Sequence, residues 1–163
     1  MNDVRAAFDE LMGQLDYPMF IVTTVTRETR AGGLIGFATQ ASIEPSRFVV
    51  CLSHTNRTYR AARAADMLGV HLVPADADAL AELFGGETGD RVDKFARCQW
   101  QPGPEGVPIL DGCPNWFVGR ILRREDAGDH DMFLLEPVAA AAGSGPGEFT
   151  FRRAKWIDPG HPA

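Results

Sequence analysis

The chain has 163 residues, 45% hydrophobic and 23% charged, which is ordinary for a soluble globular protein and enough for one domain with a sizeable core. Its formal net charge of -6 disfavours nucleic acid and anionic membrane surfaces as main partners. The three cysteines lack metal-type spacing, and no apolar segment has the length of a signal core or a membrane span. We therefore expect one domain over residues 1–163, located in the reducing cytoplasm.

The first half of the chain predicts strands and short helices. Hydrophobic residues at helical spacing, after a capping Asn2 or Asp3, indicate an amphipathic helix that ends by Pro18. Runs of β-branched residues indicate strands, and the polar residues up to Gly33 are expected to form a turn. The expected helices cover residues 2–15 and 58–65, and the expected strands cover 19–26, 34–42, 48–53 and 67–73.

The second half predicts a short helix, a long loop and a strand pair. Asp76 is the candidate cap of a helix that stops at Gly85-Gly86. Residues 87–113 read mostly as a loop, and a loop of that length in a small domain is usually functional. Strands are expected over 116–124, 132–140 and 149–151. Roughly seven strands and few helices indicate a mainly β protein, namely a closed antiparallel barrel with peripheral helices.

Residues 35–60 carry the pattern that says most about ligand binding. Small and hydroxyl side chains in the first part leave room for a flat ligand over the backbone. The polar turn that ends in Arg57-Thr58 is rich in donors and suits a phosphate. These features favour a nucleotide-type cofactor, and the alternative is an ordinary hairpin with a solvated end.

Two other patterns are candidates for ligand contacts. His130 follows Gly128-Asp129 at a strand junction, where the imidazole would face a ligand unless the segment is a plain hairpin loop. Lys94 and Phe95 would cover a planar ring or pair with phosphate, the alternative being a solvated charge beside a tucked aromatic. His71, inside an apolar strand, is expected to be a satisfied core or interface histidine.

Other chemistry finds little support in the sequence. The phosphate-loop, dinucleotide-binding and nucleophile-elbow motifs are all missing. The histidines are scattered without cysteine or carboxylate at ligand spacing, so no metal site is expected.

The order of these motifs resembles the flavin reductase-like, FMN-binding split-barrel family over about residues 17–153. This family includes NAD(P)H:flavin reductase components of two-component monooxygenases. Its first ligand segment is roughly Ser-x-Phe-Thr-Ser-Val-Ser-Leu-Asp-Pro-Pro, where this chain has Gly-Phe-Ala-Thr-Gln-Ala-Ser-Ile-Glu-Pro-Ser from residue 36. Gly36 and Gln40 replace two serines of that pattern, so some hydroxyl contacts to the flavin must differ.

The resemblance implies an antiparallel split β-barrel, a homodimer with flavin near the subunit interface, and hydride transfer from NADH or NADPH to FMN or FAD. It implies that His130 is catalytic and borders the nicotinamide, while Arg57 and Thr58 hold the phosphate. The expected cofactor-binding residues are Gly36, Phe37, Ala38, Thr39, Gln40, Cys51, Ser53, Asn56, Arg57, Thr58, Lys94 and Phe95.

The resemblance also suggests a partner monooxygenase that receives reduced flavin by diffusion. Three alternatives remain open. They are a split-barrel FMN oxidoreductase acting on another substrate, a non-catalytic flavin- or haem-binding protein, and a structural barrel with no ligand. The sequence does not choose between FMN and FAD, between NADH and NADPH, or between flavin as prosthetic group and flavin as substrate.

Overall fold

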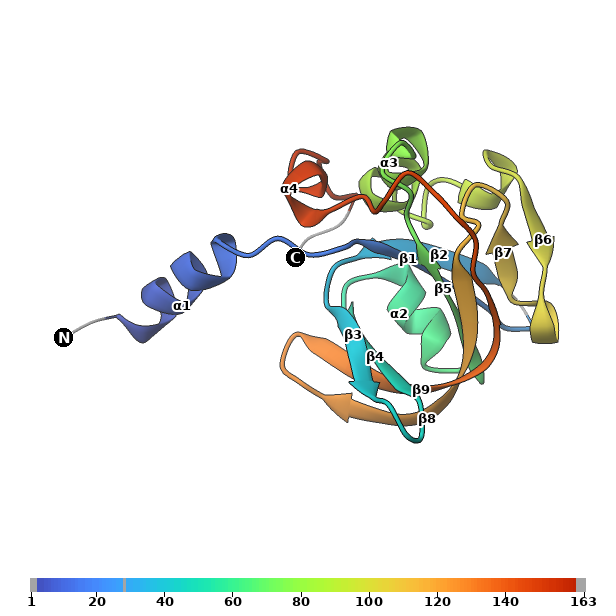
Figure 1. Cartoon of the computed structure of the whole chain (residues 1–163), viewed down its shortest axis with the longest axis horizontal. Helices are drawn as coiled ribbons and strands as arrows, with labels where there is room; N and C mark the ends of the chain where they lie inside the picture. The colour runs from blue at the N-terminus through green and yellow to red at the C-terminus, as the bar shows by residue number, and fades with distance from the viewer. Residues whose placement is uncertain (1–2, 28, 161–163) are drawn as a thin grey trace.

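A computed structural model describes residues 3–27 and 29–160, so the candidate cap Asn2 lies outside the described residues (Figure 1). Seven strands form one antiparallel sheet in the order β2-β1-β5-β8-β9-β4-β3. These strands are β1 (Phe20–Val25), β2 (Arg30–Ile35), β3 (Ala38–Ser42), β4 (Arg47–Ser53), β5 (Met67–Leu72), β8 (Trp116–Asp126) and β9 (His130–Ala141).

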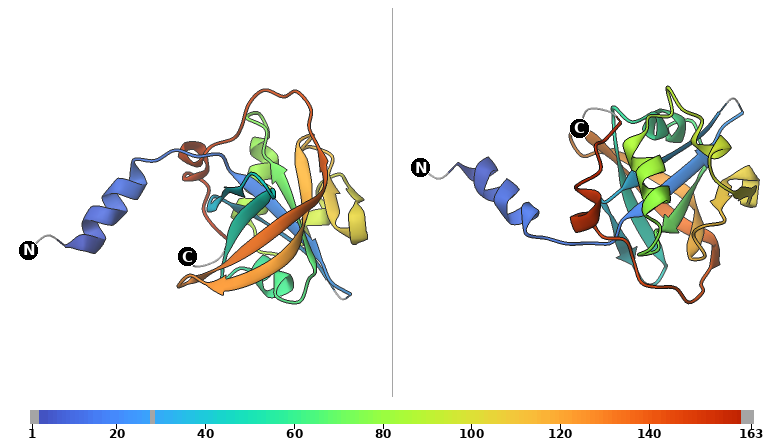
Figure 2. Two further views of the ribbon diagram at one scale, coloured as in Figure 1. Left: turned by 60° about the horizontal axis from the view of Figure 1, so that its bottom comes forward. Right: turned by 90° about the horizontal axis from the view of Figure 1, so that it is seen from above.

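The sheet curls into a barrel that is open along one seam. β2 and β3 lie at opposite edges of the sheet, yet only Gly36 and Phe37 separate them in the chain. This short link brings the two edges together, while β2 and β3 are not neighbours in the described sheet order (Figure 2). The predicted mainly β, antiparallel split barrel is therefore confirmed.

Helix α2 (Arg57–Ala62) fills the mouth of the barrel next to this seam (Figure 1). Its buried Thr58, Ala61 and Ala62 are small, so the helix packs closely against β1, β2 and β4. Asn56 caps the helix, because its Oδ1 accepts a 2.8 Å hydrogen bond from the Thr58 backbone N–H. The first turn of α2 is thereby fixed at the open edge of the barrel.

The remaining elements surround the barrel. Helix α1 (Val4–Gly13) stands away from it, and the Asp3 side chain caps its first turn. The other elements are α3 (Asp78–Gly86), η1 (Lys94–Ala96), β6 (Trp100–Pro102), η2 (Pro104–Gly106), β7 (Pro108–Leu110) and α4 (Phe151–Ala154). None of the described helices has the length and apolar character needed to cross a membrane.

Two strand predictions are wrong near the seam. The turn expected up to Gly33 belongs to β2, where Gly32 pairs with Thr23 of β1. A side chain at Gly32 would meet the Phe84 ring at 2.7 Å, so glycine here serves close packing against the sheet rather than a turn. The single strand expected over 34–42 is broken at Gly36 and Phe37, where the chain crosses from one sheet edge to the other.

Three expectations in the second half also need correction. Phe151 begins helix α4, so the last strand over 149–151 does not form, although Phe149 hydrogen-bonds to Met19 and Val73. Ala77, not Asp76, precedes α3, and no side chain caps that helix. The loop over 87–113 contains the β6–β7 hairpin and two short 3-10 helices.

Candidate functional site

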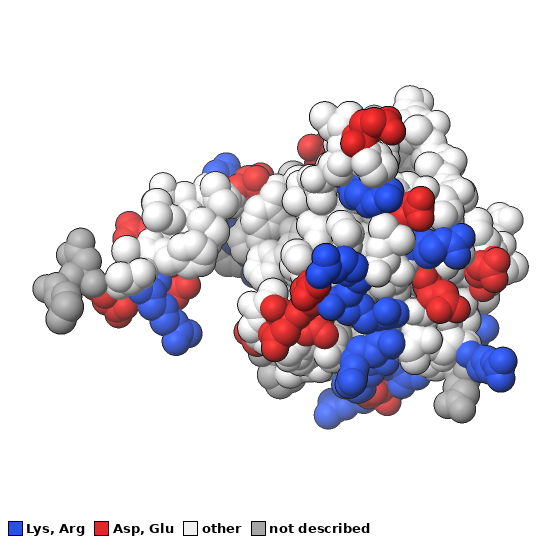
Figure 3. All heavy atoms as spheres, turned by 90° about the horizontal axis from the view of Figure 1, so that it is seen from below, with Lys and Arg blue, Asp and Glu red and all other residues white. Residues whose placement is uncertain are grey.

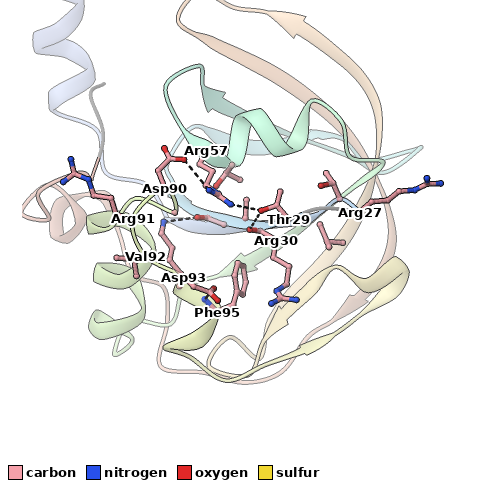
Figure 4. A pocket seen from close by; sticks show the side chains of 16 residues that line it. Arg27, Thr29, Arg30, Arg57, Asp90, Arg91, Val92, Asp93 and Phe95 are labelled. Atoms are coloured by element: carbon pink, nitrogen blue, oxygen red, sulfur yellow. Dashed lines mark hydrogen bonds and ion pairs between the residues drawn. The ribbon is translucent and has the colours of Figure 1, made fainter.

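Two cavities adjoin along edge strand β2, on either side of the turn that leads into α2. The apolar cavity, of about 370 Å³, is lined by Met12, Gly13, Tyr17, Met19, Leu34, Ile35, Gly36, Phe37, Cys51, Ser53, Asn56, His130 and Phe151. The arginine-lined cavity, of about 590 Å³, is lined by residues 25–27, 29–32, 57–58 and 89–95 (Figure 4). Successive residues Asn56 and Arg57 line one cavity each, so the two spaces are neighbours.

Aromatic rings form one wall of the apolar cavity. Tyr17 stacks on Phe151, with ring centroids 4.8 Å apart and an interplanar angle of 16°. Next to them, a Cβ at Gly36 would lie 2.6 Å from Cε2 of Tyr17 and 3.1 Å from Sδ of Met19. Glycine at this position therefore lets the Tyr17 ring close against the link between β2 and β3.

His130 lines the same cavity. It begins β9 and pairs in register with Ser53 at the end of β4. Its ring lies 5.2 Å from the half-exposed ring of Phe37, and its Nδ1 lies 2.7 Å from the carboxylate of Asp129. The His130 hydrogen bond is the main cause that lowers the pKa of Asp129. Nε2 has no hydrogen-bond partner among the described residues, so that edge of the imidazole is available to a ligand.

Arg57 occupies the centre of the arginine-lined cavity, where its side chain is directed toward Thr29 (Figure 4). It donates a 2.8 Å hydrogen bond to Oγ1 of Thr29, and its other terminal nitrogen lies 3.4 Å from the Asp90 carboxylate. Arg60 binds both oxygens of Asp90 at 2.8 Å and is the larger cause that lowers the pKa of Asp90. Because Asp90 is engaged mainly by Arg60, it leaves part of the Arg57 charge uncompensated.

Lys94 lies under β2 at the inner side of this cavity and is only 6% exposed. Its ammonium donates 3.0 Å hydrogen bonds to the carbonyl oxygens of Gly32 and Phe84. Burial lowers the pKa of Lys94 to about 8. The alternative of a solvated lysine is therefore wrong.

Two side chains next to Lys94 complete this part of the site. Phe95 is buried and makes edge contacts with Phe84 and Trp100, so it does tuck under the loop. Thr58 is 1% exposed, and its Oγ1 has no hydrogen-bond partner among the described residues. A buried hydroxyl without a partner is uncommon and calls for an explanation.

Basic side chains gather in a band on the face seen from below, with acidic side chains beside them (Figure 3). The chain as a whole carries a formal charge of -6. Positive charge is thus concentrated on part of the surface of a chain whose net charge is negative.

The cavities unite most of the predicted site residues. Those in the apolar cavity are Gly36, Phe37, Cys51, Ser53, Asn56 and His130, and those in the arginine-lined cavity are Arg57, Thr58, Lys94 and Phe95. Three others differ: Ala38, Thr39 and Gln40 line neither cavity. Thr39 and Gln40 are exposed on edge strand β3, and the Gln40 amide is turned to the Ser42 carbonyl of its own strand.

Several lining residues were not predicted. Tyr17 and Phe151 come from opposite ends of the chain, and Asp90 from the long loop, so no local spacing relates them to the rest. In the sequence, Tyr17 is marked only by its position between the predicted helix over 2–15 and the predicted strand over 19–26. His71 is a satisfied core histidine as expected: Nδ1 bonds Ile21 O at 3.0 Å, and Nε2 accepts from Leu110 N at 3.1 Å. In the described part of the chain, no group of three or more His, Cys, Asp or Glu side chains is arranged to hold a metal.

A family model described as a flavin reductase like domain matches residues 12–157. The chain belongs to the flavin reductase-like family. It is 32% identical to a protein named FMN reductase (NADH) RutF of Ancylobacter novellus over 141 residues, which are 86% of this chain and 77% of that protein.

Solved structures share the fold of this chain. The NADH:FAD oxidoreductase SgcE6 of Streptomyces globisporus has a TM-score of 0.83 at 23% identity, covering 93% of this chain and 91% of that one. The nitrilotriacetate monooxygenase component B of Mycobacterium thermoresistibile has a TM-score of 0.80 at 23% identity, covering 90% and 82%. At these identities the likeness establishes the fold.

Proposed function

We propose that this flavin reductase-like protein is an NAD(P)H:flavin oxidoreductase that moves hydride from a nicotinamide to FMN or FAD. The observation that carries the proposal is the junction of the two cavities at residues 56–57. An apolar space beside a cationic one matches a ligand with a flat ring at one end and a phosphate at the other. Relatives named FMN reductase (NADH) support the same reading.

The residues of the apolar cavity fit an aromatic ring system. Tyr17, Phe37 and Phe151 supply apolar walls, and Ser53 and Asn56 supply polar groups at its edge. The link at Gly36 carries no side chain that would fill the space. We assign the flavin ring to this cavity.

The residues of the arginine-lined cavity fit the phosphate. Arg57 offers a guanidinium at the cavity centre, and Lys94 adds a buried positive charge below it. The partnerless Thr58 Oγ1 is a hydroxyl for which a phosphate oxygen would be a suitable partner. The missing partner of Thr58 Oγ1 fits a bound phosphate well, since no described group of the protein hydrogen-bonds to this oxygen.

A bound flavin supplies the hydride acceptor, so the chain needs no nucleophile of its own. What the protein contributes is position and the exclusion of water. His130 lines the cavity, and because Asp129 holds its Nδ1, Nε2 is the ring nitrogen that can orient the nicotinamide amide. This geometry gives His130 the role of a hydrogen-bonding group toward the hydride donor.

A steady-state assay tests the proposal. Purified protein is mixed with NADH or NADPH and with FMN, FAD or riboflavin, and loss of reduced nicotinamide is followed. Rapid loss with a phosphorylated flavin is the expected result. Flavin binding without turnover would indicate a non-catalytic binder, and turnover that requires a further substrate would indicate another oxidoreductase of this fold.

We further propose that the protein is a homodimer. Helix α1 and the residues just after it expose a stripe of large hydrophobic side chains, and no residue of α1 is buried. The stripe comprises Val4, Phe8, Leu11, Met12 and Leu15. Since Met12 also lines the apolar cavity, a second copy covering this stripe would lie next to the flavin. Light scattering of the wild type and of Phe8→Glu tests this: dimer for the first and monomer for the second.

The reduced flavin would serve a monooxygenase that receives it by diffusion, a role supported by the similarity to a monooxygenase component B. We place the reaction in the cytoplasm, where the three free thiols stay reduced. Residues 1–163 would form one domain. Measuring product formation by a candidate monooxygenase, with and without a dialysis membrane between the two proteins, tests the diffusive transfer.

A further inference from the structure

A partly exposed cluster of three residues, His54, Tyr59 and Asp131, lies on the face of β9 opposite to His130. The Asp131 carboxylate accepts a hydrogen bond from Tyr59 Oη at 2.9 Å, and its other oxygen lies 2.8 Å from Nε2 of His54. The rings of His54 and Tyr59 are also in contact, with centroids 4.9 Å apart. The cluster uses both carboxylate oxygens of Asp131, so it ties three segments to a single group.

These segments carry different parts of the proposed site. His54 belongs to the turn after β4, and Tyr59 belongs to α2, whose first turn carries Arg57 and Thr58. Asp131 is the second residue of β9, directly after His130. Successive residues of a strand point to opposite faces, so His130 lines the apolar cavity while Asp131 lies on the face of β9 that also carries the buried Phe133. The Asp131 side chain is 20% exposed.

We propose that Asp131 is a positioning residue that fixes the distance between the phosphate-holding turn and the nicotinamide-facing His130. This inference rests on the proposed flavin reductase function. The hydrogen bonds of Asp131 to His54 and Tyr59 form what we call the Asp131 clamp. The clamp is connected to His130 directly through the backbone of β9. A second connection comes from His54, whose backbone N–H donates to Asp129 O at 3.0 Å. Misplacement of reacting groups by about 1 Å can cost roughly 100-fold in rate, so a clamp of this kind acts on turnover more than on binding.

The test compares three variants with the wild type. Asp131→Ala removes the clamp, Tyr59→Phe removes one hydrogen bond but keeps the ring, and His54→Gln keeps an N–H donor. Glu136→Ala is the matched control, since Glu136 is a carboxylate on the same strand with an exposed ion pair to Arg47 at 3.9 Å. The measurements are kcat and KM for NADH at saturating FMN, the FMN dissociation constant, and amide hydrogen exchange of residues 53–59.

We expect kcat to fall at least ~10-fold in Asp131→Ala, by less in Tyr59→Phe and little in His54→Gln. The FMN dissociation constant should change by less than about threefold, which is about half a decade of affinity. Amide exchange over 53–59 should accelerate in Asp131→Ala and not in Glu136→Ala.

Unchanged exchange in both Asp131→Ala and Tyr59→Phe would overturn the clamp, as would an equal loss of kcat in the Glu136 control. Wild-type protein without NADH turnover would overturn the proposed function instead. The exchange measurement still decides the clamp in that case.

Discussion

Lys94 donates a 3.0 Å hydrogen bond to the carbonyl oxygen of Gly32, so a buried cation lies directly beneath the open edge of the barrel. The same ammonium holds the Phe84 carbonyl near the end of α3. Burial outweighs the attraction of Glu87 and lowers the pKa of Lys94 to about 8. Lys94 therefore links strand β2 to helix α3 and adds positive charge to the arginine-lined cavity.

We predict that FMN affinity falls as pH rises through about 8, because Lys94 then loses its charge in the free protein. The flavin phosphate stays doubly ionised over this range, since its second pKa is about 6. Fluorescence titration of FMN on either side of this pH measures the effect. Riboflavin, which lacks the phosphate, should show no such dependence, and Lys94→Met should remove it for FMN. The same slope in Lys94→Met would assign the effect to another group.

Arg57→Ala is expected to weaken FMN binding by one to two decades. A hydrogen bond to a charged group contributes about 1.5–3 kcal/mol, and each decade of affinity is about 1.4 kcal/mol. Arg63→Ala is the matched control, because Arg63 is an exposed arginine just after α2 that does not line the cavity. Equilibrium titration with FMN measures both variants. An unaltered dissociation constant in Arg57→Ala would remove the phosphate assignment.

Gly36→Ser restores the residue of the family pattern, yet we expect it to harm this protein. The new Cβ would lie 2.6 Å from the Tyr17 ring, and overpacking of this kind costs about 1–3 kcal/mol. Urea unfolding should show the loss, and FMN binding should weaken as Tyr17 is displaced. Gly145→Ser, whose Cβ would have no neighbour nearer than 3.9 Å, is the control. Full stability with tighter FMN binding in Gly36→Ser would show that the Tyr17 ring moves aside without cost, which contradicts the prediction.

The sequence pattern predicted most strands and the turn before α2, but not the contacts between distant parts of the chain. Alternation of apolar residues and turn signals predicted most strands, and Asn56 and Arg57 were identified because their turn is a continuous segment. The stacking of Tyr17 on Phe151 depends on how the chain ends meet, which no local period encodes. The burial of Lys94 depends on carbonyl groups of Gly32 and Phe84, and backbone acceptors leave no trace in a residue pattern.

His130→Ala should reduce turnover with NADH while leaving FMN binding within about threefold, well under one decade. The reason is that His130 offers Nε2 to the donor side of the cavity, whereas Arg57 and Thr58 lie at the phosphate end. Stopped-flow reduction of flavin in the presence of protein and NADH measures the step. His130→Gln, which retains an N–H donor, should recover part of the rate. Turnover equal to that of the wild type in the alanine variant would exclude this role.

His71 makes stability depend on pH in a defined window. Desolvation lowers the pKa of this buried histidine to about 4 from an ordinary value of 6.5, so the unfolded chain binds a proton more readily. Stability from this group is therefore complete above pH 6.5 and is lost as the pH falls toward 4. The pKa difference corresponds to at most about 3 kcal/mol.

Urea unfolding of the wild type and of His71→Gln across this window tests the effect. Glutamine can donate to Ile21 O and accept from Leu110 N as His71 does, but it does not titrate. The carboxylates affect both proteins alike, so the wild-type free energy of unfolding should fall more steeply than that of the variant. Parallel curves over the window would show that His71 binds its proton equally in the folded and the unfolded chain, which contradicts the linkage.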